Sequence, residues 1–204
     1  STLFPYTTLF RSPYSAFARL LESLELEERW ASLIADWIDQ DPSALFPDGA
    51  EDSLYLSQNP PYRPPNMAIT SVSELLALPG FGRERYLRLA PFVAALPADV
   101  KVNVCTASGE VLDAYKGEAE FGVDAEDFAK KRGESCFPRL AAYEAALPEE
   151  LRTQLQQSPG LAENSNFFRL RSIVSIGTSE FTLYSLLQRD AGRVRVVMRS
   201  YSPD

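Results

Sequence analysis

Three adjoining segments at the carboxyl end of the chain, each rich in β-branched and aromatic residues, constrain the fold more than any other feature. They cover residues 167–177, 180–190 and 193–201, and short turns containing glycine separate them. Such runs predict an antiparallel meander of three strands. A three-stranded sheet with one apolar face needs a helix to cover it. The sequence therefore predicts an α+β domain in which the sheet comes last.

Two predicted helices near the start of the chain provide candidates for that cover. Between residues 15 and 38 apolar side chains recur at helical spacing, interrupted by an acidic patch at residues 25–28. This spacing predicts helices at about 15–24 and 27–39. Either the first of these helices, or one upstream of the sequence given, is expected to cover the sheet.

The middle of the chain is predicted to be mainly helical. A proline-rich connector at residues 59–66 cannot be helical and is expected to run extended over the surface. In the hairpin that follows, Ser71 or Ser73 caps the first helix, and Glu74 completes a capping box if the cap is Ser71. A Pro-Gly-Phe-Gly turn then leads into a return helix at 83–96.

A second, largely helical region is predicted before the sheet. Residues 101–106 are expected to form a short strand, and Thr106 or Ser108 to cap the helix that follows. Further helices are expected at 123–132 and, as one or two short pieces, within 138–157.

The opening segment, TLFPYTTLFRS at residues 2–12, fits none of these patterns. It shows neither helical nor strand periodicity, and it is too short and too polar for a signal peptide. Its reverse translation resembles a widely used short-read sequencing adapter. We therefore interpret residues 1–12 as a non-native, adapter-derived tail, and expect the natural reading frame to begin near Pro13.

Charge and composition limit the classes of function. The 204 residues carry a net charge of −8, which disfavours a nonspecific hold on nucleic acid or anionic lipid. The chain has no histidine, the commonest general base and a common metal ligand. No apolar run approaches the ~20 residues of a membrane-spanning helix. We expect no catalytic residues and no enzymatic activity.

An acidic loop after the second helix carries the strongest signal for a site. Its carboxylates are Asp36, Asp39, Asp41, Asp48, Glu51 and Asp52. Calcium takes about six to eight oxygen ligands, often spaced by two in a loop, as Asp39 and Asp41 are. With Asp48, Glu51 and Asp52 these two residues form the predicted calcium site. The alternatives are a solvated acidic loop whose aspartates cap turns, and the paired carboxylates of a hydrolase, for which nothing else in the sequence speaks.

The sequence LALPGFG at residues 76–82 resembles the turn of a helix-hairpin-helix module, whose backbone N–H groups bind a DNA phosphate. Arg83, Arg85 and Arg88 follow it and would suit phosphates. Against this reading, Glu84 interrupts the basic run and the whole chain is acidic. The simpler interpretation is that the hairpin is a way of packing two helices.

The two cysteines, Cys105 and Cys136, allow two states. In a cytosolic protein both would be free thiols, whereas in an exported protein a disulfide is favoured. The bridge would close a loop of about 32 residues and contribute roughly 3–4 kcal/mol in the chain-entropy model. Without histidine, a Cys–His nucleophilic pair is excluded.

Seven segments, taken in order along the chain, resemble one known family. They are DWIDQD, GAEDSLY, YRPPN, SVSELLALPGF, LAPFVAALP, VNVCTASGEVLDA and SLLQRDAGRVRVVMRS. From about residue 17 to residue 200 the chain resembles protein K of the type II secretion system (general secretion pathway protein K), a family of minor pseudopilins. In the family's Asn-x-Asn-Thr-Ala motif, Cys105 takes the place of the second asparagine.

This resemblance implies an architecture. It is a pilin-like α+β domain with an N-terminal helix, a C-terminal three-stranded antiparallel sheet and a large α-helical insertion that contains helix-hairpin-helix-like units. On this basis residues 13–66 hold the pilin helix region, the acidic loop and the connector, and lead partly into the insertion. Residues 67–160 hold the helical hairpins, and residues 161–204 form the sheet.

The resemblance also implies a function. Members of the family sit at the tip of the pseudopilus with the I and J minor pseudopilins, and serve the export of folded proteins across the outer membrane. Their globular part is periplasmic, which suits the disulfide, and it binds calcium, which we assign to the acidic loop. A hydrophobic N-terminal helix anchors them in the inner membrane of Gram-negative bacteria.

The sequence given lacks that anchor helix and the prepilin cleavage motif, as expected of a truncated reading frame. The alternative function is a helix-hairpin-helix nucleic-acid-binding module of competence type. For a pseudopilin no nucleic-acid partner is expected.

Overall fold

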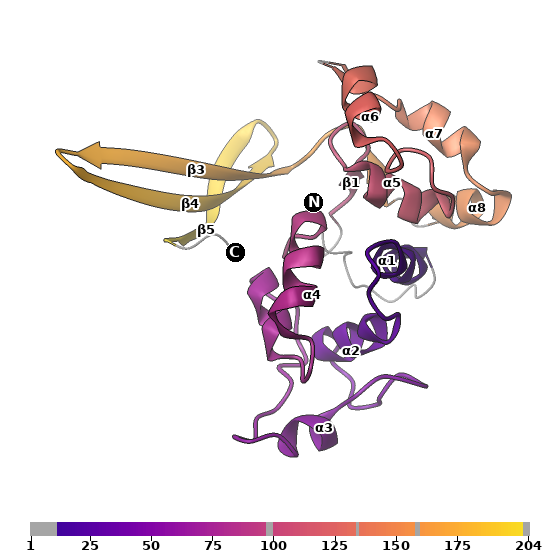
Figure 1. Ribbon diagram of the computed structural model, residues 1–204. Coiled ribbons are helices and arrows are strands. Elements are labelled where there is room, and N and C mark those ends of the chain that lie inside the picture. Colours follow the sequence, from indigo (N-terminus) through magenta and orange to yellow (C-terminus); the bar gives the residue numbers. More distant parts are fainter. Residues whose placement is uncertain (1–11, 97–99, 134, 158–159, 202–204) are drawn as a thin grey trace. The chain divides into compact units, whose positions relative to one another are not determined.

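The computed structural model describes residues 12–96, 100–133, 135–157 and 160–201. The chain divides into a helical unit that ends at Glu163 and a sheet unit that begins at Asn164 (Figure 1). The predicted adapter-derived tail lies outside the described residues except for Ser12, where α1 begins. No helix among the described residues is long and apolar enough to cross a membrane.

The helical unit is built from short elements. Its helices are α1 (Ser12–Ser23), α2 (Arg29–Ile38), α3 (Asp52–Leu56), η1 (Val72–Ala77), α4 (Gly82–Leu89), η2 (Ala90–Phe92), α5 (Gly109–Lys116), α6 (Ala125–Arg132), α7 (Leu140–Ala146) and α8 (Glu149–Gln157). Its strands are β1 (Val102–Asn103) and β2 (Leu161–Ala162). The sheet unit consists of β3 (Phe167–Ile176), β4 (Ser179–Asp190) and β5 (Arg193–Ser200).

α1 packs chiefly against α5, and also contacts α2 and α8. Its buried side chains, Ala16, Phe17, Leu20 and Leu21, belong to one apolar cluster that also holds Trp30 of α2. Burial of a Phe or Leu side chain stabilises the fold by about 1.5–3 kcal/mol. The first helix therefore uses its apolar face inside the helical unit. The expectation that this helix covers the sheet stays a prediction.

The predicted first hairpin forms, with a shorter return helix than expected. Ser71 caps η1 through a capping box with Glu74, as predicted. α4 ends at Leu89, a turn of 3-10 helix follows at Ala90–Phe92, and residues 93–96 of the predicted helix at 83–96 are not helical. Pro91 gives the reason, because proline lacks the N–H group that an α-helix requires and clashes with the preceding turn.

The strand predicted at 101–106 is only two residues long. The Asn103 side chain accepts the N–H of Cys105 at 3.0 Å, and the N–H of Ala107 bonds to the Asn103 carbonyl at 2.9 Å, so the chain turns there. β1 pairs in parallel with β2, which the sequence did not predict. The Ser108 side chain then caps α5, so of the two predicted caps, Thr106 and Ser108, the second is confirmed.

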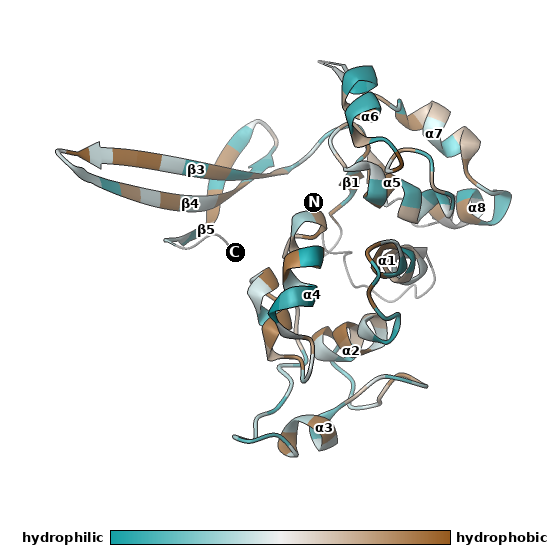
Figure 2. Cartoon of the chain, in the orientation of Figure 1, coloured by the Kyte–Doolittle hydropathy of each residue, from teal (hydrophilic) through white to brown (hydrophobic). Residues whose placement is uncertain are grey.

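The sheet unit is the predicted antiparallel meander, in the order β3-β4-β5. Figure 2 shows hydrophobic residues along much of β3. The strand register places on one face the apolar residues Phe168, Leu170, Val174, Ile176, Phe181, Leu183, Leu187, Val194 and Val196. Most of these side chains are largely exposed, and the described part of the sheet unit contains no helix to cover them.

Candidate metal centre

Asp36, near the end of α2, fixes the start of the acidic loop. Its side chain is fully buried, and its carboxylate accepts the Leu45 N–H, at 3.0 Å from Oδ2. Burial raises the pKa of this carboxyl, and the N–H groups of Leu45 and Ala50 oppose that rise. A Cβ atom on Gly49 would lie 2.2 Å from Asp36 Oδ2, so only glycine fits this turn.

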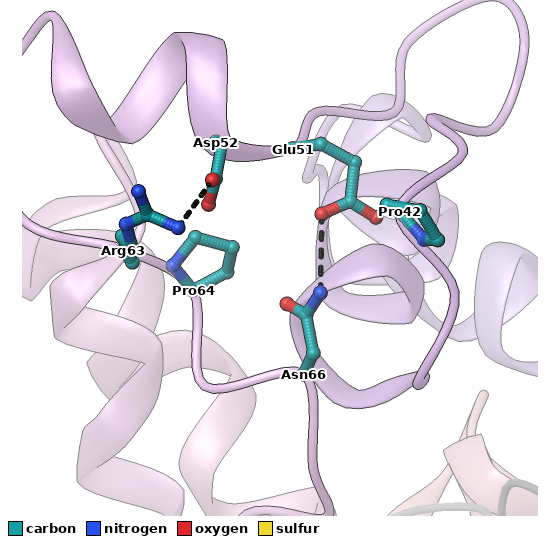
Figure 3. A pocket seen from close by; sticks show the side chains of 6 residues that line it. All are labelled: Pro42, Glu51, Asp52, Arg63, Pro64 and Asn66. Carbon is teal, nitrogen blue, oxygen red and sulfur yellow. Dashed lines mark hydrogen bonds and ion pairs between the residues drawn. The ribbon is translucent and has the colours of Figure 1, made fainter.

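Three oxygens in this region are buried without a hydrogen-bond partner among the described residues: Asp39 Oδ1, Glu51 Oε1 and Asn66 Oδ1. Asn66 Nδ2 donates to Glu51 Oε2 at 3.4 Å, which draws the connector toward the loop (Figure 3). An unpartnered buried oxygen costs about 1–3 kcal/mol. Each of the three oxygens is therefore an acceptor that no donor among the described residues satisfies.

Burial and neighbouring charges raise the pKa values of two carboxyl groups of the loop, Asp39 and Glu51. Burial raises the pKa of Asp39 to about 6, and the charges of Asp41 and Asp36 add to the shift. Burial also raises the pKa of Glu51, against the Asn66 hydrogen bond and with the charges of Asp36, Asp39 and Asp41 adding to the rise. Ionised together, these groups repel one another unless a cation lies among them.

An open pocket of about 360 Å³ lies beside these groups. Its lining residues are Pro42, Glu51, Asp52, Arg63, Pro64 and Asn66 (Figure 3). Arg63 Nη1 lies 2.9 Å from Asp52 Oδ2, so this carboxylate is already paired. Two prolines and four polar or charged residues thus line the pocket.

The structure brings together some of the predicted ligands. Asp39 and Asp41 lie close enough to Glu51 for their charges to raise its pKa, whereas Asp48 is exposed and Asp52 pairs with Arg63. Within the described ranges, no three acidic, histidine or cysteine side chains converge as metal ligands. The calcium site therefore stays a prediction.

Asn66 is the member of this set that the sequence did not predict. The prediction considered only carboxylates between residues 36 and 52, and Asn66 follows a pair of prolines outside that range. Its backbone has a positive φ of 47°, which asparagine tolerates better than most residues. The sequence feature that could have indicated Asn66 is its position as the last residue of the proline-rich connector.

The arginines after the Pro-Gly-Phe-Gly turn are engaged within the protein. Arg85 binds the Glu27 carboxylate through two nitrogens, at 2.9 and 2.8 Å. These bonds, and one from Trp30, hold the pKa of Glu27 well below its usual range. Arg88 pairs with Glu25 and Glu84. These contacts favour the interpretation of the hairpin as a packing element.

Cys105 and Cys136 form the predicted disulfide, with Cα atoms 4.5 Å apart. Arg132 supports the same region by donating to the backbone carbonyls of Val104, Ala107 and Phe137. The bridge and the guanidinium together join the segment after β1 to the segment after α6.

Comparison with known proteins gives a consistent result. The family model described as "Type II secretion system (T2SS), protein K" matches residues 9–98. Type II secretion system protein K of Pseudomonas aeruginosa is 37% identical over 195 residues, 90% of this chain and 55% of that protein. The protein of the same name from Pectobacterium carotovorum is 32% identical, over 96% of this chain and 62% of its own length.

A solved structure is similar over nearly the whole chain. It belongs to the GspK-GspI-GspJ complex of the enterotoxigenic Escherichia coli type 2 secretion system. The match has a TM-score of 0.74 at 25% identity, and covers 99% of this chain and 74% of that one. The chain spans between 55% and 62% of the length of the two relatives described above.

Proposed function

Because the chain belongs to the type II secretion system protein K family, we propose that it is the globular part of a minor pseudopilin. In this proposal the protein is a structural subunit at the tip of the pseudopilus and has no enzymatic activity. It assembles with the I and J minor pseudopilins and takes part in the export of folded proteins across the outer membrane. Its globular part is periplasmic and an N-terminal helix anchors it in the inner membrane.

One observation carries the proposal. The similarity to a chain of the GspK-GspI-GspJ complex covers 99% of this chain, so it includes both the helical unit and the sheet unit. A match restricted to the sheet would support only a pilin-like domain. The disulfide supports a location outside the cytosol, because such bridges persist in oxidising compartments.

Deletion and complementation of the complete gene in its own host tests the function. We expect the deletion strain to retain its exported proteins in the periplasm, and the complete gene to restore their export. Normal export in the deletion strain would refute the proposal. All other genes of the host are unchanged in this design. A loss of export that the complete gene restores is therefore due to this protein.

The nucleic-acid-binding alternative has no support from the comparisons. Arg85 and Arg88, two of the three basic residues on which it depended, are occupied by carboxylates of the protein itself. The net charge of −8 also opposes binding to a polyanion.

We further propose that the acidic loop binds a calcium ion. The unpartnered oxygens of Asp39, Glu51 and Asn66 are hard donors of the kind that calcium prefers. Burial, with the charges of neighbouring carboxylates adding to it, raises the pKa values of Asp39 and Glu51, and a cation beside these groups would favour their ionised forms. A bound cation would satisfy these atoms and hold the loop against α2 and the connector, which gives the ion a structural role.

A further inference from the structure

The guanidinium group of Arg132, at the end of α6, lies between the two segments that carry the cysteines. Its Nη2 and Nη1 atoms donate to two backbone carbonyls on either side of Cys105, at 3.1 and 2.8 Å. Its Nε atom donates at 3.0 Å to the carbonyl of the residue after Cys136. The three acceptors belong to Val104, Ala107 and Phe137. One rigid, planar side chain thus binds both segments at once.

Contacts that do not involve the sulfur atoms hold this guanidinium in place. Arg132 Cζ lies 4.4 Å from the centroid of the Phe128 ring, one turn earlier in α6. That ring packs in turn against Phe121 and Phe137, with centroids 5.5 and 6.2 Å away. None of these contacts depends on the disulfide. We therefore expect Arg132 to keep its position when the bridge is open.

The surroundings of the two sulfur atoms also suit free thiols. Cys105 Sγ lies 3.5 Å from the carbonyl oxygen of Glu163, and Cys136 Sγ lies 3.4 Å from that of Pro138. A thiol is a weak donor, so in the reduced protein each S–H group has an acceptor within reach. The folded protein can therefore hold both cysteines side by side as a dithiol.

We infer that Arg132 is a positioning residue for the disulfide: it holds Cys105 and Cys136 together in the folded dithiol, so that the bridge forms within the folded protein. In the dithiol the guanidinium must order the two segments itself, whereas in the disulfide form the bridge has already ordered them. The hydrogen bonds of Arg132 are therefore worth more in the disulfide form. By linkage, the bridge is favoured more strongly when Arg132 is present.

The bond-forming step requires an oxidant, which is a small-molecule disulfide such as oxidised glutathione. The thiolate of one cysteine attacks a glutathione sulfur and releases one glutathione thiolate. The second cysteine thiolate then attacks the mixed disulfide, which forms the Cys105–Cys136 bond and releases the second glutathione thiolate. The protein gives up two electrons and two protons, and one oxidised glutathione becomes two reduced molecules. Arg132 acts by keeping the second cysteine within reach of the first.

The test measures the equilibrium constant between the folded dithiol and the disulfide. The protein is equilibrated in buffers of known reduced and oxidised glutathione, alkylated, and analysed by mass spectrometry. We expect Arg132→Ala to lower this constant about tenfold, because groups in one network are energetically coupled. Arg132→Lys should recover little of the loss, since one ammonium group cannot reach three carbonyls together. Lys131→Ala is the matched control, because this exposed neighbour pairs with Asp127 on its own helix, and it should change the constant less than about twofold.

A second measurement closes the thermodynamic cycle. Urea denaturation gives the loss of stability caused by Arg132→Ala in the bridged protein and in Cys105→Ser/Cys136→Ser. The unfolding equilibrium constant should rise about tenfold more in the bridged protein than in the variant without cysteines. An independent structural contact would have the same effect in both backgrounds.

The inference is wrong if Arg132→Ala leaves the glutathione equilibrium unchanged, or if its effect on unfolding is equal in the two backgrounds. Circular dichroism in dithiothreitol shows whether each dithiol is folded. If the dithiol of Arg132→Ala is unfolded, Arg132→Lys decides the question. An equilibrium constant for Arg132→Lys equal to that of the unchanged protein would overturn the inference, whereas a loss of about tenfold supports it.

Discussion

Asp36 and Leu45 are joined by a hydrogen bond that ties the acidic loop to α2: the Leu45 N–H donates to Asp36 Oδ2 at 3.0 Å. The Ala50 N–H also bonds to this buried carboxylate. One side chain thus holds both ends of the segment between Leu45 and Ala50. The shape of the loop, and the position of the oxygens beside it, depend on this contact.

Replacing Asp36 should destabilise the protein strongly. Asp36→Ala leaves two backbone N–H groups without their acceptor in a buried site, and we expect the free energy of unfolding to fall by about 2–3 kcal/mol. Asp48→Ala is the control, because Asp48 is exposed and its loss should cost less than about 0.5 kcal/mol. Urea denaturation measures both. Equal stability of the two variants would contradict the role given to Asp36.

The acidic loop should give the metal-free protein a distinctive pH dependence. Burial raises the pKa of Asp39 from 3.8 to about 6. Between these two values the folded state holds a proton that the unfolded chain has released, so the stabilising contribution of Asp39 is lost as the pH rises through this window.

Denaturation in EDTA across this range, for the protein and for Asp39→Asn, isolates the effect. The free energy of unfolding of the unchanged protein, relative to the variant, should fall between pH 4 and pH 6. A difference that rises with pH would show that the Asp39 pKa is lowered instead.

Stabilisation by calcium should depend on pH in the opposite sense to the effect of Asp39 protonation. An ion that binds only the folded state raises the melting temperature with its concentration, and ionised carboxylates bind it best, so the effect should be larger at pH 7.5 than at pH 5. EDTA should lower the melting temperature, and Asp39→Ala or Asn66→Ala should abolish that difference.

Two predicted ligands should matter less to this calcium effect. Asp48 is exposed and Asp52 pairs with Arg63, so Asp48→Ala and Asp52→Ala should each retain most of the response to EDTA. Differential scanning calorimetry with and without calcium supplies the measurement. If EDTA has no effect on the unchanged protein, the calcium site does not exist.

The disulfide should contribute substantially to stability. Cys105 and Cys136 are 31 residues apart, and opening the bridge frees the unfolded chain, at a cost of about 3–4 kcal/mol in the chain-entropy model. Dithiothreitol should lower the free energy of unfolding by this amount. The double variant Cys105→Ser/Cys136→Ser should be equally destabilised and insensitive to the reductant. A reductant effect that persists in the double variant would rule out the bridge as its cause.

Local signals account for what the sequence predicted well. The capping residues Ser71 and Ser108, and the glycine-containing turns between β3, β4 and β5, act over a few residues and are visible in the sequence. Features that depend on distant partners were missed. The pairing of β1 with β2 joins segments far apart in the chain, and neither is long enough to show a strand pattern.

The candidate site shows the same division. Carboxylate spacing pointed to the loop between residues 36 and 52, but it could not show that Asp52 would be taken by Arg63 or that Asn66 would reach Glu51. Both contacts depend on how the proline-rich connector returns to the loop. The helical spacing of α1 likewise predicted an apolar face but could not show that this face packs against α5, a segment far away in the sequence.

The central claim is that this protein is a minor pseudopilin that assembles with its I and J companions. Native mass spectrometry of the three proteins from one genome, mixed at equal concentrations, tests it most directly. The account predicts a complex that contains all three chains and is retained on size-exclusion chromatography. An I–J pair that forms while this protein remains unbound would contradict it.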